Sequence, residues 1–336
     1  MYDVAQMSAN TEVESDLEHR NMLEAARAFY LHDESKTEIA DRLGISRFKV
    51  ARLLEQARVR GLVRITVLDG EVRGELAPSL ASHLQLDECI VVTGDAEEVT
   101  NRKELARAAA AYLMRTVRLD DSFGLSWGRT LAEIGGFVDR LPPSTAVALT
   151  GGVGTDFEQS PVEVVRTVAG DSSIHTMSIF APLFVESGEI AAALRRDPAI
   201  SSVLDRYATL DLAVLSIGSW QPPITQLMSA LSDDERAELD RLKVRAEVVG
   251  AFIDDAGRVV ETSLTRRRIA VSPRELVKIP RVLAVAGGEP KVPAMAAMAR
   301  SRILTALITD ERTARLLLDT PPVPAGPRRL ATRPLI

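Results

Sequence analysis

Between residues 89 and 310, short apolar runs alternate with segments of helical pattern, and no other feature of the sequence restricts the fold as strongly. The runs are rich in β-branched residues: CIVVT (89–93), SFGLS (122–126), TAVALT (145–150), IHTMSIFAP (174–182), DLAVLSIG (211–218), RVLAVAGG (281–288) and ILTALITD (303–310). Apolar strands that alternate with helices are typical of a mostly parallel sheet covered on both faces. The sequence therefore predicts an α/β fold for this part of the chain.

Two other segments have a different pattern. AEVVGAFIDDAGRVVETS (246–263) predicts a β-hairpin whose turn is Asp255-Ala256-Gly257. The proline-rich end of the chain, 321–336, predicts a disordered tail. A length of 336 residues is sufficient for two domains.

The segment 17–68, which precedes the strands, has the spacing of a small helical domain. A first amphipathic helix is predicted over 17–30, and a second one follows it and ends at Gly44. A third helix begins near Ser46, and GLVRITV (61–67) then predicts a turn and a strand. Two helices joined by a tight turn at a glycine are typical of the helix-turn-helix motif, and the added strand is typical of its winged variant.

The third helix is strongly basic, since it carries five cations against the single acid Glu55. Cations on such a helix can neutralise phosphates, while residues near its N-terminus can reach base edges in the major groove. We therefore predict binding of double-stranded operator DNA, although such charges can also be solvated surface. The candidate DNA-binding residues are Thr37, Ser46, Arg47, Lys49 and Arg52.

The whole chain has a formal net charge of −6, which argues against a protein that coats nucleic acid along its entire surface. It is compatible with a small basic domain attached to an acidic body. A single cysteine, Cys89, excludes an internal disulfide, and no Cys/His spacing predicts a metal site. The polar N-terminus and the lack of a long apolar run predict a cytoplasmic protein without a membrane span.

Ligands of parallel α/β sheets bind at the carboxyl ends of the strands, where loops lead into helices. One such loop, SWGRT, places Ser126, Gly128, Arg129 and Thr130 at a strand-to-helix turn, where a hydroxyl and a guanidinium can hold a phosphate. Another, GGEPK, supplies a glycine pair followed by Lys291. These loops predict a sugar-phosphate site; the alternative is that the glycines merely permit tight turns.

Other chemistries fit the sequence less well. The loop GGVG (151–154) lacks the third glycine of a dinucleotide-binding fingerprint, because Phe157 stands in its place. The chain contains no P-loop and no GxSxG nucleophile motif. Candidate acids and bases such as His175 and Glu247 fall in no motif that assigns them a catalytic role. We therefore expect neither a catalytic set nor a cofactor, and a sugar-phosphate isomerase or deaminase is the alternative from the enzyme class.

The chain resembles the SorC family of bacterial sugar-responsive transcriptional regulators from about residue 23 to residue 318. The motifs that carry the resemblance occur in order: SRFKVARLLEQARVRGLVRI, GLSWGRTL, ALTGGVG, SPVEVVR, LDLAVLSIGS, GAFIDDAGRVV, IPRVLAVAGGEPK and LITDERTARLLL. The resemblance implies a winged helix-turn-helix joined to a Rossmann-like effector domain related to sugar-phosphate isomerases and deaminases. It also implies a dimer or tetramer that binds a phosphorylated sugar or polyol without turning it over and regulates a carbohydrate or polyol catabolic operon. Sensing of an unphosphorylated sugar or polyol is the alternative within the same class.

Taken together, these interpretations predict four segments: a DNA-binding domain (17–68), a linker (69–80), an effector-binding and oligomerisation domain (81–320) and the tail (321–336). The strand-end loop contributes Ser126 as an expected effector contact, and the resemblance places the others at Gly128, Arg129, Thr130, Gly151, Gly152, Gln159, Ser160, Glu247 and Lys291. The chain departs from the family pattern at two positions. Arg129 stands where relatives often have threonine, and Phe48 stands where many have proline.

Overall fold

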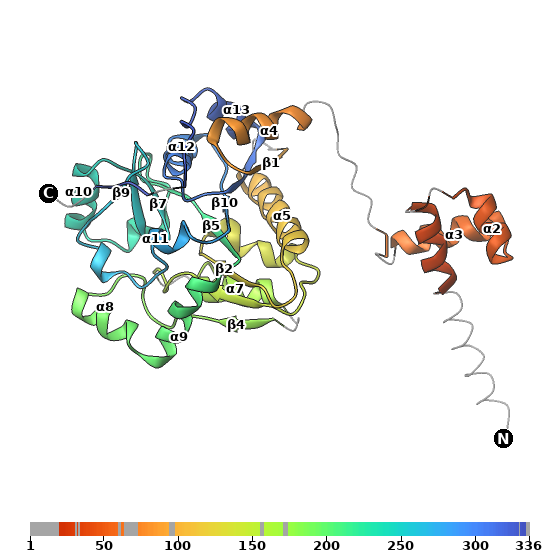
Figure 1. The fold of residues 1–336 in the computed structure, drawn as a ribbon, viewed down its shortest axis with the longest axis horizontal. Helices are drawn as coiled ribbons and strands as arrows, with labels where there is room; N and C mark the ends of the chain where they lie inside the picture. The colour runs from red at the N-terminus through yellow and green to blue at the C-terminus, as the bar shows by residue number, and fades with distance from the viewer. Residues whose placement is uncertain are drawn as a thin grey trace, which may run out of the picture. The chain divides into compact units, whose positions relative to one another are not determined.

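The computed structural model of the protein describes residues 20–30, 32, 34–59, 62–63, 73–93, 98–154, 158–170, 174–328 and 330–333. The chain divides into two compact units, one within residues 1–69 and the other within 70–336 (Figure 1). Each unit has its own buried core, and each is described by itself.

The N-terminal unit contains a helix over 20–30 followed by α2 (Lys36–Leu43) and α3 (Arg47–Val59). A capping box starts α2, because the Ser35 hydroxyl accepts from the backbone of Glu38 while the Glu38 carboxylate accepts from the backbone of Ser35. The helix ends at Gly44, whose φ of 63° is the left-handed conformation that glycine adopts without strain. The predicted wing (61–67) lies almost wholly outside the described residues and stays a prediction.

A small apolar core joins these helices. The buried side chains recur at helical spacing on each element, so each helix has one buried and one exposed face. They are Met22, Ala25, Ala26, Ala28, Ile39, Ala40, Val50, Leu53, Leu54 and Ala57.

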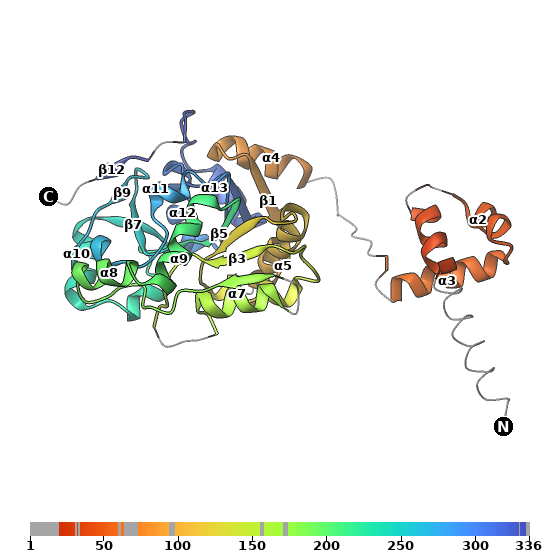
Figure 2. The same ribbon diagram turned by 60° about the horizontal axis from the view of Figure 1, so that its bottom comes forward.

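The C-terminal unit is built on a seven-stranded sheet in the order β1-β11-β10-β5-β2-β3-β4, in which every neighbouring pair is parallel (Figure 2). Each predicted apolar run supplies one strand, which confirms the prediction of a mostly parallel sheet. The strands are β1 (Glu88–Val92), β2 (Ser122–Leu125), β3 (Thr145–Ala148), β4 (His175–Met177), β5 (Leu212–Ser216), β10 (Arg281–Val285) and β11 (Ala306–Asp310).

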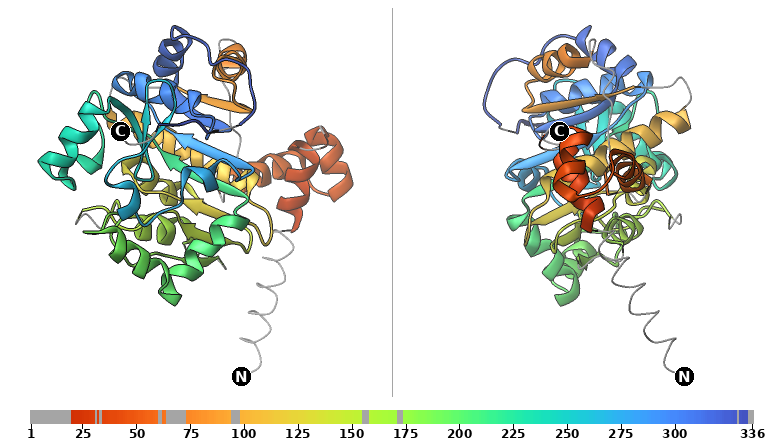
Figure 3. Two further views of the ribbon diagram at one scale, coloured as in Figure 1. Left: turned by 60° about the vertical axis from the view of Figure 1, so that its left-hand side comes forward. Right: turned by 90° about the vertical axis from the view of Figure 1, so that its right-hand side faces the viewer.

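Helices cover both faces of this sheet (Figure 3). Successive strand residues point to opposite faces, so Ala146 and Ala148 join one apolar core while Val147 joins the other. The first core includes side chains of α5 (Glu98–Thr116) and α7 (Pro161–Ala169). The second core includes side chains of α4 (Arg73–Leu84), α8 (Gly188–Arg195), α9 (Pro198–Arg206), α12 (Val292–Arg300) and α13 (Glu311–Leu318). The remaining α-helices of the unit are α6 (Arg129–Ala132), α10 (Asp233–Arg241) and α11 (Pro273–Leu276).

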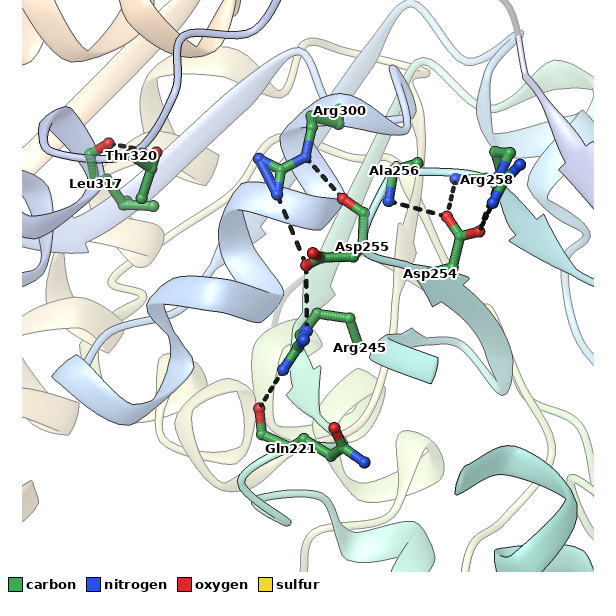
Figure 4. A network of polar contacts seen from close by, with 9 residues as sticks. All are labelled: Gln221, Arg245, Asp254, Asp255, Ala256, Arg258, Arg300, Leu317 and Thr320. Carbon is green, nitrogen blue, oxygen red and sulfur yellow. Dashed lines mark hydrogen bonds and ion pairs between the residues drawn. The ribbon is translucent and has the colours of Figure 1, made fainter. Parts of the chain in front are cut away.

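A second sheet has five short strands in the order β12-β9-β8-β7-β6, and the sequence predicts only the hairpin within it. Its strands are β6 (Gly218–Ser219), β7 (Val244–Val248), β8 (Ala251–Asp254), β9 (Val259–Val260) and β12 (Thr332–Arg333). The predicted hairpin is confirmed, because β8 and β9 pair antiparallel across residues 255–257. Figure 4 shows that this turn is tied to α12 and to β7: Arg300 of α12 donates to the Asp255 carbonyl at 2.8 Å, and Arg245 of β7 donates to the Asp255 carboxylate at 3.2 Å.

The structure corrects two predictions about the ends of the C-terminal unit. The predicted disordered tail is wrong for 321–328 and 330–333, since Val323 is buried and β12 pairs with β9. The predicted linker (69–80) is wrong from residue 73 onward, where α4 begins. Leu76, Leu80 and Leu84 recur every four residues on α4 and pack into the core, so this helix belongs to the domain. Within the described part of the chain, no helix is long and apolar enough to cross a membrane.

Candidate functional site

A pocket of about 860 Å³ opens at the carboxyl ends of the central strands of the seven-stranded sheet. Parallel strands place their carboxyl ends at one edge, so loops distant in sequence converge there. The loops after β2, β5 and β10, the end of β11 and the first turns of α5 all contribute lining residues, as do 223–226 and Glu247. Five of the ten predicted effector contacts line this pocket: Gly128, Arg129, Thr130, Glu247 and Lys291.

The loop after β2 passes close to the end of β5. Gly128 has a φ of 137°, a conformation that side-chain-bearing residues rarely adopt, and a Cβ there would lie 3.0 Å from the Ser216 hydroxyl. That hydroxyl donates to the Trp127 carbonyl at 2.7 Å and holds the loop against the strand. The glycine therefore permits the backbone turn that brings Arg129 and Thr130 to the pocket.

Ion pairs surround the mouth of the pocket. Arg129 lies 3.1 Å from the Glu98 carboxylate, and Arg102 lies 3.3 Å from the same carboxylate. Arg312 pairs with Glu289 in the same way. The Arg129 side chain is 45% exposed and that of Glu98 is 72% exposed. Pairs this exposed contribute little to stability, so an incoming anion can compete with the glutamate for the arginine.

Lys291 supplies a partly buried cation, and its Nζ donates to the Ile217 carbonyl at 3.0 Å. Burial, and next the neighbouring charge of Arg129, lower the pKa of the Lys291 ammonium to about 8, while Glu247 opposes the shift. The ammonium is therefore still mostly protonated at neutral pH and can meet a negative charge.

Glu247 supplies a buried carboxyl group on β7, with only 3% of its surface exposed. Its Oε1 accepts from the Gly250 backbone at 2.8 Å, and its Oε2 accepts from the Thr225 hydroxyl at 3.3 Å. Burial raises the pKa of the Glu247 carboxyl to about 7, although these hydrogen bonds and the charges of Lys291 and Arg268 oppose the shift. The group can therefore exchange a proton near neutral pH.

The other five predicted contacts do not line this pocket. Ser126 is buried, and its backbone donates to the Val214 carbonyl at 3.1 Å. Ser160 caps α7, because its hydroxyl accepts from the backbone of Glu163 at 3.2 Å. Gln159 comes nearer to the pocket, since its side chain bonds to that of the pocket residue Gln226.

The two glycines of the loop after β3 pack against other backbone segments. A Cβ on Gly151 would lie 2.4 Å from the Ala181 carbonyl oxygen, and the Gly151 backbone donates to the Ile269 carbonyl. Gly152 forms an isolated bridge with Pro182. Close backbone packing accounts for Gly151 without a ligand, whereas a Cβ on Gly152 would have no atom within 4 Å, so packing does not explain that glycine.

Sequence reasoning missed Asp310, which organises one wall of the pocket. One of its carboxylate oxygens, Oδ2, accepts from the Gly288 backbone at 2.9 Å, from the Thr313 hydroxyl at 2.7 Å and from the Asn101 amide at 3.2 Å. Burial favours a higher pKa for this carboxyl, but the hydrogen bonds outweigh burial and hold its pKa below the ordinary value. A Cβ on Gly287 would lie 2.4 Å from the same oxygen. An acid at the end of an apolar strand, three residues before Thr313, was the available signal.

The predicted DNA-binding residues lie in the N-terminal unit. Arg47, Lys49 and Arg52 are exposed on α3, and Thr37 is exposed on α2. The Ser46 hydroxyl accepts from the backbone of Lys49 at 3.2 Å and so caps α3.

Comparison with known proteins gives consistent results. The family model of a sugar-binding domain matches residues 72–319. The erythritol catabolism regulatory protein EryD of Brucella abortus is 31% identical over 88% of this chain and 96% of its own length. The deoxyribonucleoside regulator of Bacillus subtilis is 28% identical over 88% of this chain and 96% of its own length. Among solved structures, the full-length sorbitol operon regulator SorC of Klebsiella pneumoniae has a TM-score of 0.73 at 21% identity, covering 89% of this chain and 98% of its own.

Proposed function

The chain belongs to the SorC family of sugar-binding transcriptional regulators, and from this premise we propose how its affinity for operator DNA is controlled. The controlling ligand is a phosphorylated sugar or polyol that binds in the pocket at the carboxyl ends of the central strands. The regulated genes are those of a carbohydrate or polyol catabolic operon. The names of the relatives, which regulate erythritol catabolism and a sorbitol operon, support a polyol or a compound derived from one.

The observation that carries this proposal is the pairing of opposite charges within one pocket. Lys291 and Arg129 both line the pocket, the charge of Arg129 acts on Lys291, and Thr130 follows Arg129 in the sequence. Glu247 contributes the acceptor, and its charge also acts on Lys291. A phosphorylated polyol matches this arrangement, because its phosphate meets the cations while its hydroxyls donate to the carboxylate.

The DNA-binding half of the proposal uses the exposed face of α3. Arg47, Lys49 and Arg52 meet phosphates or base edges, Ser46 sets the start of the helix, and Thr37 donates to the DNA backbone. A dimer or tetramer presents two such helices to an inverted repeat. The effector acts by binding one arrangement of the subunits more tightly than the other, which shifts the population between them.

The mouth of the pocket favours a second candidate, an unphosphorylated polyol, in one respect. Arg129 and Arg102 already pair with Glu98, so the arginines are partly neutralised within the chain. Asn101 adds a buried side-chain oxygen with no hydrogen-bond partner within the described residues, and this oxygen can accept from a hydroxyl.

Fluorescence anisotropy on labelled DNA from upstream of the protein's own gene separates these candidates. The titrations use a fixed, stated salt concentration and a panel of sugars and polyols, each compared with its phosphate. Lys291→Met removes this partly buried cation, so we expect about ten- to hundredfold weaker action of the phosphorylated effector with unchanged binding of DNA alone. Lys278→Met removes an exposed lysine of the same unit and serves as the matched control.

The possible results differ clearly. If only unphosphorylated polyols shift the DNA-binding curve, the phosphate assignment is wrong and the second candidate holds. If neither the natural upstream DNA nor any duplex selected from a random pool binds, the chain is not a DNA-binding regulator. Turnover of a sugar phosphate by the purified protein would instead show an isomerase- or deaminase-like enzyme.

A further inference from the structure

The N-terminal unit exposes one large aromatic side chain without a packing partner. Phe48, in the first turn of α3, is 88% exposed and is the most exposed large apolar residue among those that the structure describes. The chain folds without burying this ring, although burial of a phenylalanine side chain is normally favourable. The ring is therefore available to a binding partner.

The helical geometry places Phe48 on the outermost line of α3. Val50, Leu53 and Ala57 form the face that packs into the core of the unit. Phe48 and Arg52 are four residues apart, so they share a face, and this face is opposite the buried one. Phe48 thus points away from its own domain.

The charges around Phe48 identify the kind of partner. Arg47 and Lys49 flank it in sequence, Arg52 lies one turn further on, and all three are exposed. Glu55 is the single acid in the sequence of α3. A second copy of this face would bring these cations against the same cations, which disfavours self-association there. A polyanion is complementary to the whole face.

Within the major groove of duplex DNA, the apolar group that a side chain can contact at a base edge is the C5-methyl group of thymine. We propose that Phe48 is a specificity-determining residue that packs against a thymine methyl in each half of the operator. Arg47, Lys49 and Arg52 then position the helix on the backbone and on neighbouring bases. This inference rests on the proposed DNA-binding function. It adds to that function a preference for thymine, which the basic residues do not supply because their charged groups do not pack against the methyl.

Replacement of thymine by deoxyuridine tests the proposal directly, because it removes only the methyl group. The probe is a duplex that the full-length protein itself selects from a random-sequence pool, with each thymine replaced in turn. For the wild-type protein, we expect about fourfold weaker binding when the contacted thymine in one half-site is replaced, and little change elsewhere. Phe48→Ala should weaken binding to the unmodified duplex about tenfold or more and should remove the sensitivity to deoxyuridine.

Two variants serve as controls. Phe180→Ala removes a ring of similar exposure, 85%, from the C-terminal unit and should leave DNA binding unchanged. Phe48→Leu keeps an apolar side chain and should keep part of the deoxyuridine effect. Phe48 is exposed, so its replacement is not expected to unfold the unit.

Each outcome distinguishes this proposal from the proposed function. If the protein selects a duplex but Phe48→Ala binds it as tightly as wild type, or remains equally sensitive to deoxyuridine, the inference about Phe48 is wrong while DNA binding stands. If Phe48→Ala instead changes the oligomeric state in sedimentation and no thymine methyl matters, the ring belongs to a contact between copies. If no duplex is selected at all, both the DNA-binding function and this inference fail.

Discussion

Glu247 is an ionisable residue whose carboxyl group is buried, and its burial opposes its ionisation. Its carboxyl group is almost fully buried, yet it keeps two hydrogen-bond donors, the Gly250 backbone and the Thr225 hydroxyl. Burial raises the pKa of this group from 4.5 to about 7, against the effect of these bonds. The folded state therefore holds the proton more tightly than the unfolded state, so stability falls as pH rises from about 4.5 to about 7. Above that range, the ionised carboxyl group lowers the free energy of unfolding by about 3 kcal/mol relative to its value at low pH.

Glu247→Gln removes this ionisation and should flatten the pH dependence. We expect the variant and the wild type to have similar free energies of unfolding near pH 4.5, and the variant to gain by up to about 3 kcal/mol above pH 7. Urea unfolding followed by tryptophan fluorescence measures this, because both tryptophans, Trp127 and Trp220, are buried in the C-terminal unit. A difference between the two proteins that stays constant from pH 4.5 to pH 8 would contradict the assigned pKa.

Sequence patterns located some pocket residues and missed others for a physical reason. Gly128 and Lys291 follow predicted strands directly, so the strand-end rule was sufficient to bring them together. Asn101 and Asp310 are separated by more than two hundred positions and meet only because β1 and β11 pair, a register that periodicity does not specify. Gly151 illustrates the opposite case: the same strand-end position can hold a glycine for backbone packing alone.

At the scale of elements, prediction succeeded where the pattern was long and failed where an element was short. The strands of the parallel sheet are continuous apolar runs, which only a doubly covered sheet buries. In contrast, β6, β9 and β12 have two residues each, too few to show any periodicity. The composition of the proline-rich end predicts disorder. Composition does not reveal that Val323 is buried or that Arg328 reaches three carbonyl groups.

Arg328 should therefore contribute measurably to stability. Its guanidinium donates to the Ile303 carbonyl at 2.7 Å, to that of Ile279 at 3.1 Å and to that of Arg302 at 3.4 Å. Arg328→Ala leaves these acceptors without their donor and should lower the free energy of unfolding by about 1–3 kcal/mol in the same urea assay. Arg274→Ala, at an exposed arginine, is the control and should change it by less than about 0.5 kcal/mol. An equally small effect at Arg328 would mean that the tail does not stabilise the domain.

At the scale of the whole molecule, the pocket and the exposed face of α3 belong to different compact units. In the proposed function, the effector therefore acts on DNA binding through an equilibrium between states of the whole protein. The size of that action is a coupling free energy, typically about 1–3 kcal/mol, which corresponds to about 5- to 150-fold in affinity.

Such a coupling is reciprocal, and this gives a prediction that does not depend on knowing how the units move. If the effector weakens operator binding, saturating operator must weaken effector binding, and if it strengthens the one, it strengthens the other. The total coupling free energy is the same in both directions, so with two equivalent effector sites on an operator-bound dimer the factor on operator affinity is the square of the factor per effector site. Isothermal titration of the effector into the free protein and into the protein–operator complex, at one salt concentration, measures the second factor, and anisotropy measures the first. Lys291→Met should reduce effector binding in both states while leaving the ratio between them nearly unchanged, because the proposed function places this lysine at the effector and not at the DNA. Total coupling free energies that differ well beyond experimental error, once the number of effector sites is counted, would show that the binding event measured by titration is not the one that acts on DNA binding.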